Sequence, residues 1–131
     1  VGFGLVDHLL AQLIERGVNV ATAQDDVADP YYPFGRGDML EVASFFAHVA
    51  QLYRPDETPV VLDAVTRNPA RAMRLAGYGL EVGGRGDLVV LEGAADATEA
   101  LRLQPPRRYV VKAGRVVAQT LTSRTWGGDA R

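Results

Sequence analysis

Cysteine is absent from the 131 residues of the chain. Its absence excludes disulfide bonds, thiolate metal sites and cysteine nucleophiles, and it fits an intracellular protein, so we expect a cytoplasmic location. An excess of one charge sign is also absent, because 14 basic and 16 acidic residues give a formal net charge of -2. With no basic cluster and no apolar run near the roughly 18 residues of a membrane span, we expect neither nucleic acid nor a membrane as a partner.

An initiator methionine is missing as well. The chain begins Val1-Gly2-Phe3-Gly4, without the basic segment and long apolar core of a signal peptide. We therefore expect this start to lie inside a longer domain. What the chain does have, 47% hydrophobic residues, is enough for one ordinary domain with a hydrophobic core.

The start of the chain has the pattern of half a β/α unit. Apolar residues recur at helical spacing from Leu5 to Ile14, and Gly17 stands where a helix C-cap belongs. The apolar run over residues 18–23 then predicts a short buried strand. The loop over residues 24–37 is long for such a connection, which favours a functional role.

Three further helices are predicted from their caps and apolar stripes. The first has an Asp cap with a Glu three residues later, the second an Asp cap, and the third an Asn cap followed by Pro. These cap residues are Asp38, Asp56 and Asn68, and the first of the helices is expected to end near Tyr53.

Composition changes at residue 77, where five glycines crowd residues 77–86. This is the expected internal boundary, with a helical part before it and a small β part after it. The β part is predicted to contain a strand ending at Leu91, a helix over residues 96–103 and a hairpin that turns at Ala113-Gly114. Arg107 and Arg108 are interpreted as a solvated strand start, and the tail from residue 121 is expected to fray.

Paired carboxylates end the predicted strand over residues 18–23. Asp25 and Asp26 follow it directly, and an aromatic loop with Tyr31, Tyr32 and Phe34 comes next. The carboxyl ends of buried strands are where open α/β sheets and β/α barrels collect catalytic side chains. The segment therefore predicts one wall of an active site, with Asp29-Pro30 as a turn initiator and Phe34 in the core.

The motifs Asp25-Asp26-Val27, Tyr31-Tyr32-Pro33-Phe34-Gly35 and His48-Val49-Ala50-Gln51-Leu52 closely resemble the C-terminal part of cytosine deaminases, members of the amidohydrolase superfamily. Further similar segments are Thr66 to Met73 and Leu80 to Leu91. The resemblance implies an α/β fold in which residues 1–76 form the last portion of a (β/α)8 TIM-type barrel. Residues 77–120 then form strands of a small C-terminal β-sandwich, and residues 121–131 form a tail.

The same resemblance implies roles for individual residues. Asp25 falls where the family's last barrel strand presents a catalytic carboxylate that binds a divalent metal, zinc or iron, and takes a proton from the attacking water. Asp26 and Tyr31 fall where the family lines the substrate pocket. Tyr31 replaces a usual Trp and Gln24 replaces a common His, which points to a shifted substrate range.

Other parts of the family's site are missing from the chain. The resemblance implies a site with a His-x-His pair, further histidines and a proton-shuttling Glu. This chain has only two histidines, His8 and His48. These two lie on different predicted helices without metal-ligand spacing, and His48 is interpreted as a packing residue. A complete barrel needs roughly 250 residues. We therefore expect a C-terminal fragment that binds no metal by itself and is inactive alone.

Two functions remain open from the sequence. In the first, the complete protein is a hydrolase of non-peptide C–N bonds in a small heterocyclic amidine, most simply a cytosine deaminase-like enzyme. In the second, the chain is a non-catalytic structural or interaction module, or a subunit that completes a barrel with another polypeptide. Either function is compatible with a homo-oligomer or with association with a missing N-terminal part, since open strand edges favour association.

Overall fold

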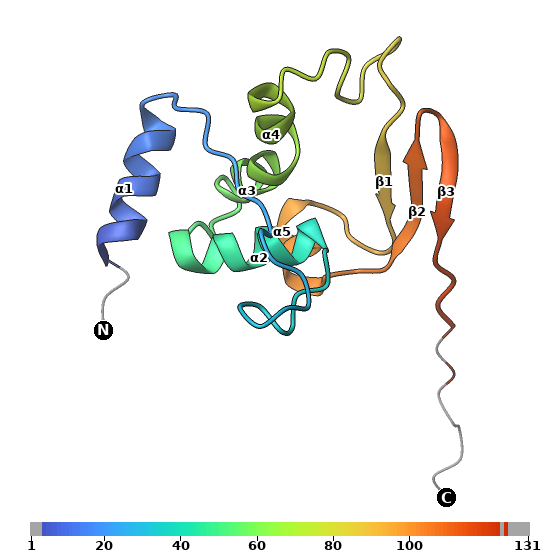
Figure 1. The fold of residues 1–131 in the computed structure, drawn as a ribbon, viewed down its shortest axis with the longest axis horizontal. Helices are drawn as coiled ribbons and strands as arrows, with labels where there is room; N and C mark the ends of the chain where they lie inside the picture. The colour runs from blue at the N-terminus through green and yellow to red at the C-terminus, as the bar shows by residue number, and fades with distance from the viewer. Residues whose placement is uncertain (1–3, 124, 126–131) are drawn as a thin grey trace, which may run out of the picture.

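The computed structural model describes residues 4–123 and 125. Four helices come first in the chain, and the three strands follow with a fifth helix between the first and second strand (Figure 1). Five helices and three strands are assigned within these residues. The helices are α1 (Gly4–Glu15), α2 (Met39–Ala50), α3 (Thr58–Val65), α4 (Arg67–Ala72) and α5 (Ala97–Leu103). The strands are β1 (Leu88–Leu91), β2 (Arg107–Lys112) and β3 (Arg115–Gln119).

Helix α2 forms the centre of the core. Its small residues Ala43, Ala47 and Ala50 allow close approach, and the ring of Phe46 fills the space beside them. α2 packs against α1, α3 and α5. Val61 of α3 is fully buried in the same cluster. The core is therefore built where four helices meet, and the sheet lies to one side of it (Figure 1).

The three strands form one antiparallel sheet in the order β1-β2-β3. Val89 pairs with Val110, and Val111 pairs with Val116. Ala113 and Gly114 both have positive φ, at 50° and 72°, which is the conformation of a type I′ two-residue hairpin turn. The predicted hairpin and the strand ending at Leu91 are confirmed.

Helix ends are confirmed in some places and wrong in others. Asp38 caps α2 by accepting from the backbone N–H groups of Leu40 and Glu41, and Gly17 has the positive φ of a C-cap glycine, 74°. α2 ends at Ala50, earlier than predicted, because Gln51 is in the left-handed conformation. The last turn therefore stops before Tyr53.

Two predicted helix caps are wrong. Asp56 does not cap α3: Glu57 occupies that position, and the carboxylate of Asp56 pairs with Arg54 instead. Asn68 lies inside α4, whose N-cap is Thr66. A local sequence pattern names residues that are able to cap, whereas the competing partners decide whether they do.

Residues 18–23 are extended, but the predicted strand is not formed among the described residues. A strand requires a ladder to a neighbour, and the described part of the chain offers none beside this segment. The TIM-barrel assignment therefore remains a prediction here, as does the division at residue 77, which lies in the irregular connection between α4 and β1. Within the described residues, no helix is both long and apolar enough to cross a membrane.

Phe34 and Arg107 also differ from prediction. Phe34 is 83% exposed, so it is not part of the core. Arg107 is not solvated: its side chain is 22% exposed and pairs with Asp38. Of the predicted tail, residues 124 and 126–131 lie outside the described residues.

Gly86 provides a test of this packing. It has a φ of +67°, and an added Cβ would lie 2.9 Å from the backbone nitrogen of Gly114 in the hairpin turn. We expect Gly86→Ala to lower the free energy of unfolding by about 2–3 kcal/mol, from left-handed strain plus displacement of the turn. Urea unfolding measures the loss.

Gly93→Ala is the matched control for Gly86→Ala. Gly93 has a φ of +84°, but its added Cβ would meet nothing within 4 Å. It should therefore lose only the strain, about 1 kcal/mol. Equal losses at the two positions would mean that the contact with the hairpin turn carries no free energy.

Candidate active site

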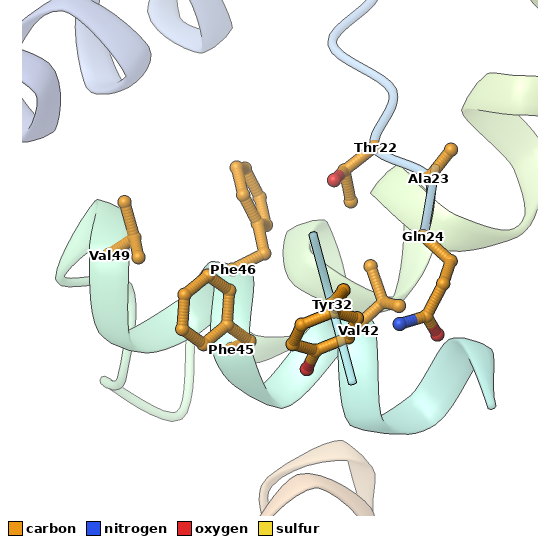
Figure 2. Close-up of a pocket in the computed structure, with 8 residues that line it drawn as sticks. All are labelled: Thr22, Ala23, Gln24, Tyr32, Val42, Phe45, Phe46 and Val49. Carbon is orange, nitrogen blue, oxygen red and sulfur yellow. The ribbon is translucent and has the colours of Figure 1, made fainter. Parts of the chain in front are cut away.

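The extended segment over residues 18–24 has two different faces. Val20, Thr22 and Gln24 are partly buried toward the helices, whereas Ala21 and Ala23 are exposed. Figure 2 shows Thr22 and Gln24 on the α2 side and the methyl group of Ala23 directed away from it. This alternation is the side-chain period of an extended chain. Asp25 comes next and is also exposed, so Ala21, Ala23 and Asp25 together form the open face of the segment.

Two asparagines hold this segment against the helices. The Asn68 side-chain amide of α4 donates to the Val20 carbonyl at 2.7 Å, and the Asn19 amide donates to the Asn68 carbonyl at 3.0 Å. The Thr22 N–H donates to the Ala64 carbonyl at 2.9 Å. We call Asn19 and Asn68 the asparagine clamp. It fixes the path of the backbone that leads to Asp25.

The chain turns sharply after the segment. Asp25 and Ala28 have left-handed backbone conformations, with φ of 65° and 53°, each of which costs about 1 kcal/mol or more for a residue with a Cβ. The Asp29 carboxylate accepts from the backbone N–H groups of Tyr31 and Tyr32, both at 2.9 Å. The predicted turn initiator at Asp29-Pro30 is confirmed by this geometry.

Asp26 and Asp29 have opposite pKa shifts. The N–H donors of the aromatic loop, with Tyr32 the largest cause, lower the pKa of Asp29 below its ordinary value. A side-chain hydrogen bond to Asp29 raises the pKa of Asp26, with burial and the neighbouring Asp25 charge acting in the same direction. The two carboxyl groups therefore titrate as a coupled pair.

A cavity of about 390 Å³ lies between the segment and α2. Figure 2 shows the Tyr32 ring beside Phe45 and Val42 in this cavity. Gln24 also lines it, and its Oε1 atom is buried without a hydrogen-bond partner in the described structure. The complete lining is Thr22, Ala23, Gln24, Tyr32, Val42, Phe45, Phe46 and Val49.

The three predicted site residues are not brought together by this cavity. Asp25 and Asp26 do not line it, and Tyr31 is 88% exposed. The cavity lies between the segment and α2, and exposed Asp25 is not part of its lining. The role expected of Asp25 therefore stays a prediction.

The described residues do not fit a complete metal centre. They contain no group of three or more His, Asp or Glu side chains able to hold a metal ion. Asp25 supplies a hard oxygen donor of the kind zinc or iron accepts, but further ligands would have to come from elsewhere. His48 places Nδ1 2.7 Å from the Ser44 carbonyl on its own helix, and it is exposed, so the prediction that it is a packing residue is wrong.

Several residues of this region were not predicted from the sequence. Tyr32, rather than its neighbour, lies in the cavity, and both members of the asparagine clamp were overlooked. The alternation of small and polar residues over residues 18–25 was the available signal for the two faces. No local signal marks the clamp, because its members are 49 positions apart.

The asparagine clamp gives a stability prediction. We expect Asn68→Ala to lower the free energy of unfolding by about 1–2 kcal/mol, because the Val20 carbonyl loses its donor while partly buried. Chemical denaturation measures the loss. Arg71→Ala on the same helix is the control, since its exposed 3.4 Å contact with Asn19 should contribute little; equal effects would argue against the clamp.

The carboxyl pair gives a pH prediction. Since the pKa of Asp29 is depressed in the folded chain, its contribution to stability is present above its ordinary value of 3.8 and is lost as pH falls through the folded pKa. The raised pKa of Asp26 acts with the opposite sign, because folding favours its protonated form. Acid titration followed by carboxyl carbon NMR should therefore find the two midpoints on opposite sides of that value.

Asp29→Asn tests whether the carboxylate of Asp29 is the cause of the raised pKa of Asp26. It keeps an oxygen for the turn but removes the charged acceptor, so the pKa of Asp26 should fall toward its ordinary value. Asp56→Asn, whose carboxylate pairs with Arg54, should leave Asp26 unchanged. If the Asp26 midpoint stayed high in Asp29→Asn, burial or the charge of Asp25 would be the cause of the raised pKa, and not the hydrogen bond to Asp29.

Comparison with known proteins gives a consistent family. The amidohydrolase family profile matches residues 8–118. The 5-methylcytosine deaminase of Klebsiella pneumoniae, solved with 5-fluorocytosine, has a TM-score of 0.81 and 34% identity over 90% of this chain and 29% of its own. The N-isopropylammelide isopropylaminohydrolase of Burkholderia multivorans has a TM-score of 0.73 and 39% identity over 79% of this chain and 26% of its own.

Curated relatives agree. The N-isopropylammelide isopropyl amidohydrolase of a Pseudomonas species is 32% identical over 82% of this chain and 27% of its own length. The pterin deaminase of Rhizobium rhizogenes is 32% identical over 86% of this chain and 25% of its own. The chain thus spans about a quarter of the curated relatives it matches. The predicted kinship with the C-terminal part of cytosine deaminase-like proteins is confirmed, and the chain belongs to the amidohydrolase family.

Proposed function

We propose that the complete protein is a metal-dependent hydrolase of non-peptide C–N bonds in small heterocyclic amidines, acting as a cytosine deaminase-like deaminase. The observation that carries the proposal is the position of Asp25, which ends the extended segment on its open face with the asparagine clamp behind it. The similarity to a 5-methylcytosine deaminase and a pterin deaminase supports the amidine class of substrate.

In this proposal water adds to the ring carbon that bears the amino group, the C–N bond breaks and ammonia leaves. Asp25 accepts the proton of the water on a carboxylate oxygen, which is the role of a general base. A Glu outside the described residues relays protons to the substrate, so that the amino group leaves as ammonia. A bound divalent metal, zinc or iron, with Asp25 among its ligands, would supply the lowered pKa of that water. The other ligands would come from outside the described residues.

Asp26 and Tyr31 orient the heterocycle. Asp26 follows Asp25 directly and keeps its proton to higher pH than an ordinary Asp because of its hydrogen bond to Asp29. Its carboxyl oxygens can accept hydrogen bonds from the N–H groups of an amidine edge. Tyr31 is exposed and free of the core, so its ring is available to lie against a planar substrate.

A second candidate is a non-catalytic module or a subunit that completes a barrel with another polypeptide. The absence of a three-ligand metal group among residues 4–123 and 125 favours it for the isolated chain. The unpaired extended segment supports association with a further part of the protein or with a second copy, since an open edge templates strand pairing. Stoichiometric, tightly bound metal in the isolated chain would contradict this candidate and the fragment interpretation together.

Asp25→Asn in the complete protein tests the enzymatic proposal. We expect kcat/KM for deamination of cytosine, 5-methylcytosine, a pterin or an ammelide, whichever is turned over, to fall by about 10²–10⁴-fold, because the amide cannot accept the proton. Metal content measured by plasma emission should fall with it. Ammonia release, coupled to a dehydrogenase, measures the rate.

Asp63→Asn is the control for this substitution. Asp63 lies in α3 and pairs with Arg67 at 3.6 Å on the surface, so its loss should change the rate by less than about twofold. Unchanged deamination and unchanged metal content in Asp25→Asn would overturn the role assigned to Asp25.

A further inference from the structure

Three chain segments meet at the start of α2. The N-terminus of α2 begins at Met39, α5 ends at Leu103, and β2 begins at Arg107. The side-chain amide of Gln104, the C-cap of α5, donates to the Leu40 carbonyl of α2 at 3.2 Å. The β part of the chain is therefore joined to the helix that follows the aromatic loop.

Arg107 makes the charged contact at this junction. Its Nη2 donates to Asp38 Oδ1 at 2.5 Å, and its Nη1 donates to the Pro105 carbonyl at 2.7 Å. The side chains of Arg107 and Asp38 are 22% and 28% exposed. Since both groups are largely removed from water and the guanidinium is held at two points, the pair is more than a loose surface ion pair.

One carboxylate oxygen of Asp38 accepts hydrogen bonds both from the helix and from Arg107. The Oδ1 atom that meets Arg107 also accepts the N–H of Leu40 at 2.9 Å as the helix cap. Moving this carboxylate would therefore disturb the first turn of α2 and the backbone that enters it. That backbone is held farther back at Gly35, which is buried.

Gly35 connects Asp38 to the base of the aromatic loop. A Cβ on Gly35 would lie 2.6 Å from the Tyr32 ring, 3.1 Å from the Asp26 carbonyl and 3.1 Å from the Gln24 amide nitrogen. The two ends of the loop are thus packed against each other at this glycine. Gly35 stands three positions before Asp38, so the cap of α2 and the backbone of Asp26 are linked by a short stretch of chain.

We propose that the Arg107–Asp38 ion pair lets the β part of the chain position the aromatic loop over residues 25–37, which makes Arg107 a positioning residue for the site. The effect on catalysis rests on the proposed function. The effect on the loop does not, because it follows from the contacts of Asp38 and Gly35 alone.

Asparagine separates the helix cap from the ion pair. Asp38→Asn keeps a capping oxygen, since Asn is as good an N-cap as Asp, but it removes the charge that Arg107 meets. Arg107→Met removes the charge from the other side and keeps a long apolar stem. The double variant should add little to either single variant, because both break the same contact.

Hydrogen–deuterium exchange of the chain, read by mass spectrometry, tests the loop. We expect exchange over residues 25–37 to rise about tenfold in Asp38→Asn and in Arg107→Met, with the double variant no faster. Exchange over α4, which packs on α3 and not at this junction, should rise by less than twofold. Arg108→Met is the control. Arg108 has only weak contacts, at 3.9 Å to Glu92 and 3.4 Å to the Thr120 carbonyl, so its loss should leave both segments unchanged.

Three results would overturn the proposal. Unchanged exchange of residues 25–37 in both single variants would show that the loop holds its position without the ion pair. An equal rise in α4 and in the loop would show a general loss of stability. A rise of the same size in Arg108→Met would show that any lost charge on β2 has the effect.

Kinetics of the complete protein test the consequence for the site. A displaced loop should raise KM about tenfold and lower kcat much less, because Asp26 and Tyr31 are proposed to orient the substrate while Asp25 keeps its chemistry. A pure loss of active protein would lower kcat alone and leave KM unchanged, which would overturn the positioning role. If the unsubstituted protein deaminates none of the compounds, the proposed function fails, and the exchange result still decides the loop.

Discussion

The burial of one face of α2 is the constraint on which the other features depend. Ala43 is fully buried and the small Ala47 and Ala50 follow on the same face, so α1, α3 and α5 approach one helix closely. Close packing of this kind leaves α2 few alternative positions. Its first residue then fixes where the aromatic loop must end, and its cap Asp38 becomes a joint at which loop, helix and sheet are tied together.

Sequence reasoning succeeded where the deciding interaction is local. The hairpin at Ala113-Gly114, the cap at Asp38 and the turn at Asp29 each depend on residues within about three positions, so a short pattern contains the cause. It failed where a distant partner decides. Asn68 has the local pattern of a cap but bonds to a carbonyl 48 positions away, and the ion pair of Arg107 spans 69 positions.

The candidate site also contains features that the sequence predicts and features that it does not. The paired aspartates were predicted to form a site because they follow an apolar run that resembles a strand; the strand is not formed among the described residues, and the site role stays a prediction. Which tyrosine turns inward could not be predicted, because Tyr31 and Tyr32 are adjacent and a turn reverses the alternation of side chains. The Asp29 carboxylate sets that turn by holding both tyrosine N–H groups, so Tyr32 enters the cavity and Tyr31 stays exposed.

The two faces of the extended segment explain why its strand is predicted and yet unformed. Its helix side is complete: backbone groups of Val20 and Thr22 are bonded to α3 and α4, and the side chains there are partly buried. Its other side presents only the methyl groups of Ala21 and Ala23 before Asp25. Small residues let another chain segment approach the backbone closely. Unpaired backbone N–H and C=O groups of a strand favour pairing with such a segment. The side of the segment that has no strand partner among the described residues is therefore the side on which Asp25 is exposed.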